Sequence, residues 1–168
     1  IIDKKKKIIK IFTWEQFYGK SKKKLKKIDL PVIIMSGGKG NRLKPFTEVL
    51  PKALIPIDNK AIIEVIIESF FEQNIKNYYL VINYKHEIIK SYFNSIKTKY
   101  KVKFIQENKF LGTMGGLSLL KRKIKSDFFV TNCDVIFDID VGELYYQHKK
   151  NKNDITIVVT LKEFKIPY

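Results

Sequence analysis

Glycines and basic residues are interleaved in residues 36–44, SGGKGNRLK, a segment whose chemistry suits the binding of phosphate. Glycine lets the backbone turn sharply and bring its N–H groups close to an anion, while basic side chains place positive charge around the same point. The segment follows residues 31–35, PVIIM, which are too short and too rich in β-branched side chains for a helix. They indicate a buried strand, so we predict a phosphate-binding loop at a strand end.

Two common phosphate-loop patterns do not fit this segment. No Lys-Ser or Lys-Thr pair follows the glycines, which excludes GxxxxGK[ST], and the residues after Gly40 do not complete GxGxxG. Residues 37–47, GGKGNRLKPFT, and 51–57, PKALIPI, instead resemble the signature of the sugar-phosphate nucleotidyltransferases, approximately GGxGTRLxPLT and then PKPLxPV. Asn41 and Ala53 depart from that signature, and neither change removes a charged group.

The resemblance implies a reaction and a role in it for each residue of the loop. In this family an oxygen of a sugar-1-phosphate attacks the α-phosphorus of a nucleoside triphosphate in line, and pyrophosphate leaves. Such catalysis rests on positioning and on the neutralisation of charge. By resemblance, Arg42 would steady the leaving pyrophosphate and Lys52 would contact phosphate near the reacting centre; the alternative for both is solvated surface charge. The residues implied in holding the triphosphate are Gly37, Gly38, Lys39, Gly40 and Asn41.

A second motif indicates how the nucleobase would be recognised. Residues 107–116, ENKFLGTMGG, resemble the family motif ExxPLGTAG, in which Glu107 and Gly112 would occupy the positions that read the base and Thr113 would be a further nucleotide-binding residue. A carboxylate only accepts hydrogen bonds, so Glu107 suits guanine, which offers two donors on one edge, better than uracil or thymine. We therefore favour GTP and an enzyme of the mannose-1-phosphate guanylyltransferase type. The alternative for Glu107 is an ordinary carboxylate near the start of a helix.

A third motif predicts a metal ligand. Asn132-Cys133-Asp134 follows the apolar residues 128–131 and resembles the NGD motif of the family, with Cys133 in place of glycine. Mg²⁺ prefers oxygen ligands and keeps several waters, so Asp134 is the expected ligand of a Mg²⁺ cofactor. We interpret Cys133 as a small packing residue, and Asp140 as the N-cap of a helix that follows it.

Helical and strand periodicities alternate along the rest of the chain. The segments that predict helices are 61–73, 86–96, 114–124 and 141–150. The segments that predict strands are 31–35, 77–83, 101–105, 128–132 and 155–161. This order predicts an α/β fold with a doubly wound, mostly parallel, Rossmann-like sheet flanked by helices, which the resemblance specifies as the nucleotide-diphospho-sugar transferase type. Because ligands bind beyond the carboxyl ends of such strands, we expect the three motifs to converge.

Composition limits the classes of function. The chain has 168 residues, 45% of them hydrophobic and 30% charged, which is typical of one globular domain. A net charge of +16 would attract polyanions, but the lysines are spread along the whole chain, which argues against a nucleic-acid-binding module. One cysteine excludes an internal disulfide and suits the cytoplasm. No apolar run approaches the roughly 20 residues of a membrane span.

Residues 1–30 read as a basic linker or the remnant of an upstream domain, with lysine runs on both sides of an aromatic segment. That segment, WEQFYG, resembles family members that carry upstream CBS-type repeats; the alternative is a basic amphipathic segment that touches a membrane or nucleic acid. Because the chain begins with Ile1, we expect a fragment in which residues 31–168 form the nucleotide-binding part of a domain truncated at its C-terminus.

The function expected of the whole protein is the synthesis of a nucleotide sugar for glycan or polysaccharide assembly. Its substrates would be a nucleoside triphosphate and a sugar-1-phosphate, and the resemblance is compatible with a homo-oligomer. The chain by itself is expected to be weakly active or inactive, because the family places a second metal carboxylate and most of the sugar pocket further along. A catalytically silent or regulatory relative that binds nucleotide remains the alternative function.

Overall fold

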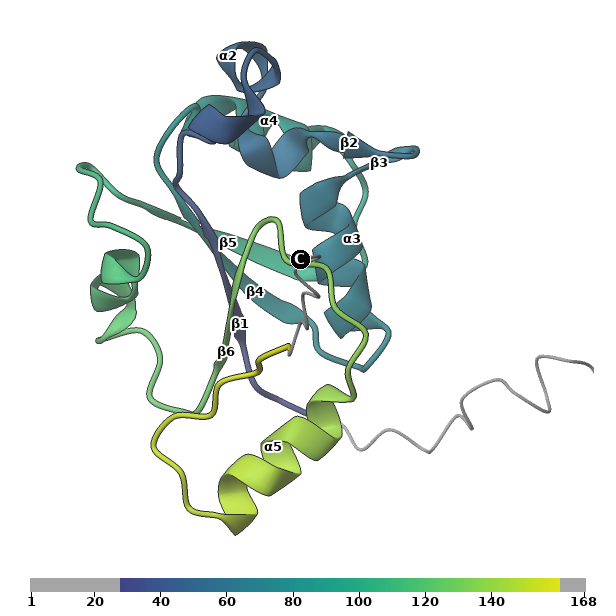
Figure 1. Cartoon of the computed structure of the whole chain (residues 1–168), viewed down its shortest axis with the longest axis vertical. Coiled ribbons are helices and arrows are strands. Elements are labelled where there is room, and N and C mark those ends of the chain that lie inside the picture. The colour runs from purple at the N-terminus through teal and green to yellow at the C-terminus, as the bar shows by residue number, and fades with distance from the viewer. Residues whose placement is uncertain (1–27, 161–168) are drawn as a thin grey trace, which may run out of the picture.

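The sheet is parallel and has the strand order β5-β4-β1-β6 in the computed structural model, which describes residues 28–160 (Figure 1). β1 (Val32–Ser36) pairs on one side with β4 (Asn77–Ile82) and on the other with β6 (Phe129–Asn132). β5 (Lys101–Gln106) pairs with β4 at one edge. All three pairings are parallel, which confirms the predicted fold class.

Residues 1–27 and 161–168 lie outside the described part of the chain, so the structure describes only residues 28–30 of the proposed basic linker. Among residues 28–160, none of the helices combines the length and the apolar composition that crossing a membrane would require.

Three helices lie at positions that the periodicity predicted: α3 (Ile62–Phe71), α4 (His86–Ser95) and α5 (Val141–Lys150). Asp140 is the N-cap of α5, as expected, because its Oδ1 accepts a hydrogen bond from the N–H of Glu143 at 3.0 Å. Short elements that the periodicity did not reveal lie between β1 and α3. They are the 3-10 helices η1 (Asn41–Leu43) and η2 (Lys52–Leu54), the helix α2 (Phe46–Val49), and the hairpin strands β2 (Pro56–Ile57) and β3 (Lys60–Ala61).

The side chains of β1 point alternately into two apolar clusters, one on each face of the sheet. Val32 and Ile34 pack with α3 and α4, whereas Ile33 and Met35 pack with Leu120 on the opposite face. A strand that is buried on both faces needs a continuous apolar sequence, which is what residues 32–35 supply. The buried residues of α3 follow helical spacing and are Ile63, Ile66, Ile67 and Phe70. The core therefore fixes the position of the strand that carries the glycine loop.

Two predicted elements differ in the structure. The helix predicted over residues 114–124 is the shorter 3-10 helix η3 (Gly115–Leu120), which begins with two glycines. Each glycine is about 1 kcal/mol less favourable in an α-helix than alanine. The strand predicted over residues 155–161 is not formed by residues 155–160, and Ile155 and Ile157 are 78% and 77% exposed. Its β-branched sequence favours a strand, but no described strand pairs with it.

We predict that Tyr78→Phe lowers the free energy of unfolding by about 1 kcal/mol, because two buried carbonyl groups lose their donor. Tyr78 is 1% exposed, and its hydroxyl donates to the carbonyl oxygens of Ile75 at 2.7 Å and Ile67 at 3.2 Å. Urea denaturation measures the change. The matched control is Tyr79→Phe, which removes only a 3.4 Å contact with the exposed Lys103. Equal losses in both variants would contradict this account of Tyr78.

Candidate active site

The three sequence motifs converge at the carboxyl ends of the parallel strands. The glycine loop leaves β1, Glu107 follows β5, and Asp134 lies just beyond β6. Parallel pairing places these three strand ends at the same edge of the sheet. The N–H of Cys133 donates to the carbonyl oxygen of Met35 at 3.1 Å, so the pairing of β6 with β1 continues almost as far as Asp134.

Gly40 has a conformation and a packing environment that require glycine. Its φ of 67° lies in the left-handed region, and a Cβ there would lie 2.8 Å from Thr47 Cγ2. Thr47 is buried, and its hydroxyl donates to the carbonyl oxygen of Gly40 at 3.0 Å. Gly38 differs, because a Cβ built on it would have no atom within 4 Å. The loop is therefore anchored at Gly40 and faces open space at Gly38, where an anion could approach its backbone.

The cations of the loop differ in their surroundings. Lys39 and Arg42 are exposed, and neither forms an ion pair within residues 28–160. Lys44 is paired with Glu48 at 3.3 Å on the surface. Asn41 is exposed as the first residue of η1. The structure thus leaves two of the three cations of the loop, Lys39 and Arg42, available to an anionic ligand.

Lys52 and Asp134, far apart in the sequence, form an ion pair with an Nζ to Oδ2 distance of 2.5 Å. Lys52 begins η2 and Asp134 follows β6, and their side chains are 27% and 36% exposed. This ion pair brings the first and third motifs into direct contact. Between β6 and Asp134, burial and the nearby Asp134 charge raise the pKa of the Cys133 thiol to about 11. The thiol stays protonated at neutral pH, which supports its interpretation as a packing residue.

The three motifs supply one carboxylate, that of Asp134, as the ligand of the predicted magnesium site. Within residues 28–160, no group of three or more His, Cys, Asp or Glu side chains is arranged so that it could hold a metal ion. Mg²⁺ is commonly bound by one or two carboxylates together with substrate phosphates and waters, so a single carboxylate beside a phosphate loop fits this mode. The residue that would hold the ion is Asp134, which is partly exposed.

The Glu107 carboxyl group is buried between two glycines. Glu107 is 3% exposed; a Cβ on Gly37 would lie 3.0 Å from its Oε2, and a Cβ on Gly116 would lie 2.4 Å from its Oε1. Oε1 has no hydrogen-bond partner among the described residues. Burial raises the pKa of the carboxyl group, and the backbone N–H of Leu111 opposes that rise. The Glu107 carboxyl group therefore lies between the glycine loop and η3, and its Oε1 is free to accept a hydrogen bond from a ligand.

Two residues that contact Glu107, Asn83 and Gly116, were not among the predicted site residues. Asn83 Nδ2 donates to the carbonyl oxygen of Glu107 at 2.8 Å, and Asn83 follows β4, so the polar residue at that strand end was the available signal. Gly112, in contrast, was predicted, and it has a φ of 83° with open space where a side chain would begin. The neighbouring Thr113 is exposed. The segment that follows Glu107 is therefore open to a ligand at Gly112 and Thr113.

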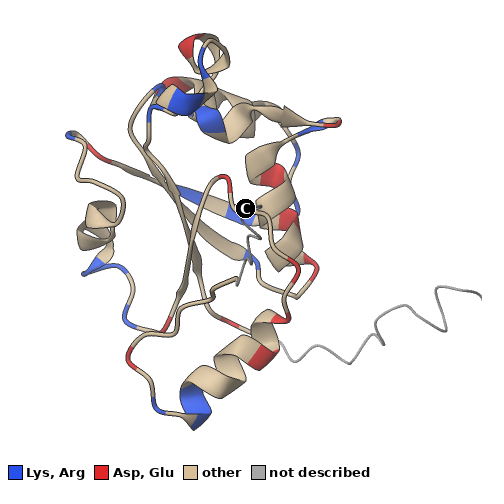
Figure 2. Cartoon of the chain, viewed as in Figure 1, with Lys and Arg blue, Asp and Glu red and all other residues tan. Residues whose placement is uncertain are grey.

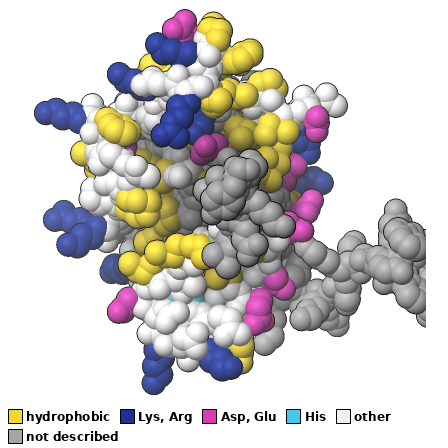
Figure 3. All heavy atoms as spheres, in the orientation of Figure 1, with side chains coloured by type: hydrophobic (Ala, Val, Ile, Leu, Met, Phe, Trp, Pro, Cys, Tyr) yellow, Lys and Arg dark blue, Asp and Glu magenta, His cyan; other side chains and the backbone are white. Residues whose placement is uncertain are grey.

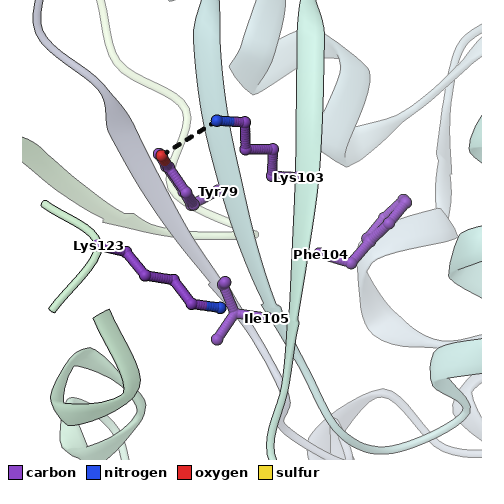
Figure 4. A pocket seen from close by; sticks show the side chains of 5 residues that line it. All are labelled: Tyr79, Lys103, Phe104, Ile105 and Lys123. Carbon is purple, nitrogen blue, oxygen red and sulfur yellow. Dashed lines mark hydrogen bonds between the residues drawn. The ribbon is translucent and has the colours of Figure 1, made fainter. Parts of the chain in front are cut away.

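A separate hollow of about 400 Å³ lies along β4 and β5 (Figure 4). Its lining residues are Tyr79, Lys103, Phe104, Ile105 and Lys123. Lys103 Nζ donates to Tyr79 Oη at 3.4 Å, while the ring of Phe104 points away from the other side chains. None of the predicted site residues lines this hollow, so it is distinct from the candidate site.

We predict that Gly116→Ala destabilises the fold by about 1–3 kcal/mol through overpacking. The new methyl group would lie 2.4 Å from Glu107 Oε1 and 2.5 Å from Val81 Cγ1, so buried groups must shift. The matched control is Gly38→Ala, where the methyl group meets open space. Thermal unfolding of both variants measures the difference, and an unchanged midpoint for Gly116→Ala would contradict the packing described for Glu107.

Comparison with known proteins places this geometry in a family. The family model for nucleotidyl transferases matches residues 31–167. The D-glycero-alpha-D-manno-heptose 1-phosphate guanylyltransferase of Campylobacter jejuni is 36% identical over 121 residues, which are 72% of this chain and 55% of that enzyme. The mannose-1-phosphate guanyltransferase of Yarrowia lipolytica is 39% identical over 136 residues, which are 78% of this chain and 38% of that enzyme.

A solved structure agrees with these sequence comparisons. HddC from Yersinia pseudotuberculosis, in a structure described as complexed with GMP-PN, has a TM-score of 0.63 and 30% identity, with 71% of this chain and 54% of that chain covered. The chain thus spans about half the length of the Campylobacter relative and of HddC. Because the family model extends over nearly all of the chain from the glycine loop onward, the chain belongs to the nucleotidyl transferase family, the sugar-phosphate nucleotidyltransferases that its motifs resemble.

Proposed function

We propose that the whole protein is a sugar-1-phosphate guanylyltransferase. An oxygen of the sugar phosphate would form a bond to the α-phosphorus of GTP, the bond from that phosphorus to the bridging oxygen would break, and pyrophosphate would leave. The observation that carries this proposal is the convergence at one sheet edge of an open glycine loop, the Lys52–Asp134 pair and the buried Glu107. Two polyanions must meet in this reaction, so the site needs fixed positive charge and backbone donors.

The preference for GTP rests on Glu107. Its Oε1 is a buried acceptor without a partner among the described residues, and guanine offers two N–H donors on the edge that a carboxylate can accept. The C. jejuni and Y. lipolytica relatives are both named as enzymes that transfer a guanylyl group. A guanine edge that reached Oε1 would satisfy this acceptor and stabilise the ionised carboxyl group.

The phosphates would be held by the glycine loop and its cations. Backbone N–H groups of residues 37–41 would face the triphosphate, with Arg42 on the leaving pyrophosphate and Lys52 near the α-phosphate. Asp134 would orient Lys52 through their ion pair. Mg²⁺, held by Asp134 and by phosphate oxygens, would supply positive charge that lowers the repulsion between the two substrates. Both proposed cationic side chains, Arg42 and Lys52, thus belong to the motifs that converge at the sheet edge.

The distribution of charge bears on the alternative functions. Lysine and arginine residues lie on many elements of the fold (Figure 2) and are dispersed over the face seen in Figure 3. A nucleic-acid-binding module would gather them into one stripe or patch. A silent relative would have no need to retain Arg42, Lys52 and Asp134 at their motif positions. We place the proposed synthesis of a nucleotide sugar in the cytoplasm, where such substrates are made, and homo-oligomerisation stays a prediction.

The direct test is calorimetric titration of the protein with GTP, CTP, UTP, dTTP and ATP in the presence of Mg²⁺. We expect GTP to bind most tightly, and Arg42→Ala and Asp134→Ala each to weaken its binding about tenfold or more, the effect of losing a hydrogen bond to a charged group. The matched controls are Arg122→Ala and Asp154→Ala, which alter exposed residues that belong to none of the three motifs. Equal, salt-sensitive binding of every nucleotide and of random oligonucleotides would refute the proposal, because only net charge would then be acting.

We also predict a pH dependence of the GTP preference. The pKa of Glu107 is raised by burial, so part of the carboxyl population is neutral at weakly acidic pH and cannot accept both guanine donors. The ratio of GTP to ATP affinity should therefore increase as pH rises from roughly 5 to 8, with triphosphate ionisation cancelling in the ratio. Glu107→Gln should abolish this increase. An affinity ratio that stays constant with pH in the unsubstituted protein would remove Glu107 from base recognition.

A further inference from the structure

The turn that follows β4, residues 83–85, contacts both the phosphate side and the base side of the site. The N–H of Tyr84 donates to the carbonyl oxygen of Gly37 at 3.4 Å, while Asn83 Nδ2 donates to the carbonyl oxygen of Glu107 at 2.8 Å. The turn is therefore placed between the glycine loop and the Glu107 segment. The family motifs quoted above do not include these residues.

The same turn holds α2 by hydrogen bonds to three carbonyl groups of that helix. Tyr84 Oη donates to the carbonyl oxygen of Thr47 at 3.3 Å, and Lys85 Nζ donates to the carbonyl oxygen of Val49 at 2.9 Å and to that of Glu48. These are carbonyl groups at the end of a short helix, where hydrogen-bond acceptors lack partners and partial negative charge accumulates. A lysine ammonium group is well suited to that position.

Apolar packing contributes little to the position of α2. Phe46 and Val49 are 69% and 72% exposed, and Thr47 is the one buried residue of this helix. A four-residue helix is also too short to be stable by itself. The contacts from Tyr84 and Lys85 are therefore a main attachment between α2 and the sheet.

Displacement of α2 would reach the phosphate loop through Thr47. The Thr47 hydroxyl donates to the carbonyl oxygen of Gly40 at 3.0 Å, and its Cγ2 occupies the space beside the Gly40 Cα. Gly40 holds the left-handed turn of the loop. Lys85 itself has a φ of 51°, a conformation that lysine rarely adopts and that costs of the order of 1 kcal/mol, so the surrounding contacts must hold it.

We propose that Lys85 is a positioning residue, which together with Tyr84 fixes α2 and so holds Gly40 in the conformation that binds the triphosphate. Lys85 acts through backbone carbonyl groups and does not contact the nucleotide. The link to the triphosphate rests on the proposed function, whereas the attachment of α2 does not.

The test combines amide hydrogen exchange in the absence of nucleotide with GTP titration, for Lys85→Met, Lys85→Arg and Tyr84→Phe. In Lys85→Met we expect about tenfold faster exchange at Leu43, Glu48 and Leu50, whose amides donate within the loop and α2, with no change in β1. GTP affinity should fall about tenfold in Lys85→Met. Lys85→Arg, which keeps a cationic donor, should retain most of the slow exchange and most of the GTP affinity of the unsubstituted protein. Tyr84→Phe, which removes one of the three contacts, should give a smaller change of the same kind.

The control is Lys149→Met, which removes an exposed lysine paired with Asp127 at 3.3 Å.

Each outcome distinguishes this proposal from the function on which it rests. Unchanged exchange in Lys85→Met would refute the attachment of α2, and a fall in affinity without faster exchange would indicate a direct contact with nucleotide instead. Faster exchange with unchanged GTP affinity would refute the coupling to the phosphate loop. If the unsubstituted protein bound no triphosphate, the proposed function would fail, and the exchange measurement would still decide whether Lys85 holds α2.

Discussion

The parallel pairing of β1 with β4 on one side and β6 on the other is the constraint on which the site depends. Because the four strands of this sheet run in the same direction, their carboxyl ends lie at one edge, and each of the three motifs follows one of these strands. The apolar residues of β1 are buried on both faces, so its register against its neighbours is strongly fixed. The glycine loop thus begins at the end of a strand that is paired on both sides and buried along its whole length.

The site built on this edge relies on polar contacts more than on apolar packing. Lys52 and Asp134 hold η2 beside the end of β6, and the turn at residues 83–85 holds α2 beside the end of β4. Polar contacts of this kind position these short segments without enclosing the loop, and the backbone at Gly38 stays open. The buried Glu107 carboxyl is the exception, because desolvation there disfavours its charged form in the absence of a ligand. A donor-bearing ligand would reverse that cost.

Sequence periodicity failed where an element depends on a partner or on backbone cost. Residues 155–160 carry a strong strand pattern, yet among the described strands none pairs with them and their apolar side chains are exposed. The helix predicted over residues 114–124 begins with Gly115 and Gly116, and a tight 3-10 helix forms in its place. The absence of a side chain at Gly116 makes room for Glu107, so the glycine that weakens the helix also shapes the site.

The sequence by itself determined where the four strands of the parallel sheet and the helices α3, α4 and α5 lie along the chain, and which motifs follow those strands, because these depend on local periodicity and on residue types at fixed spacing. It also identified the family, since the glycine loop and its PKALIPI continuation are nearly contiguous. The contact of Lys52 with Asp134, the burial of Glu107 between two glycines and the attachment of α2 by Lys85 were decided by the tertiary structure alone. Each joins segments distant in the chain, and their meeting depends on strand order, register and the packing of loops, which no local pattern of residues encodes.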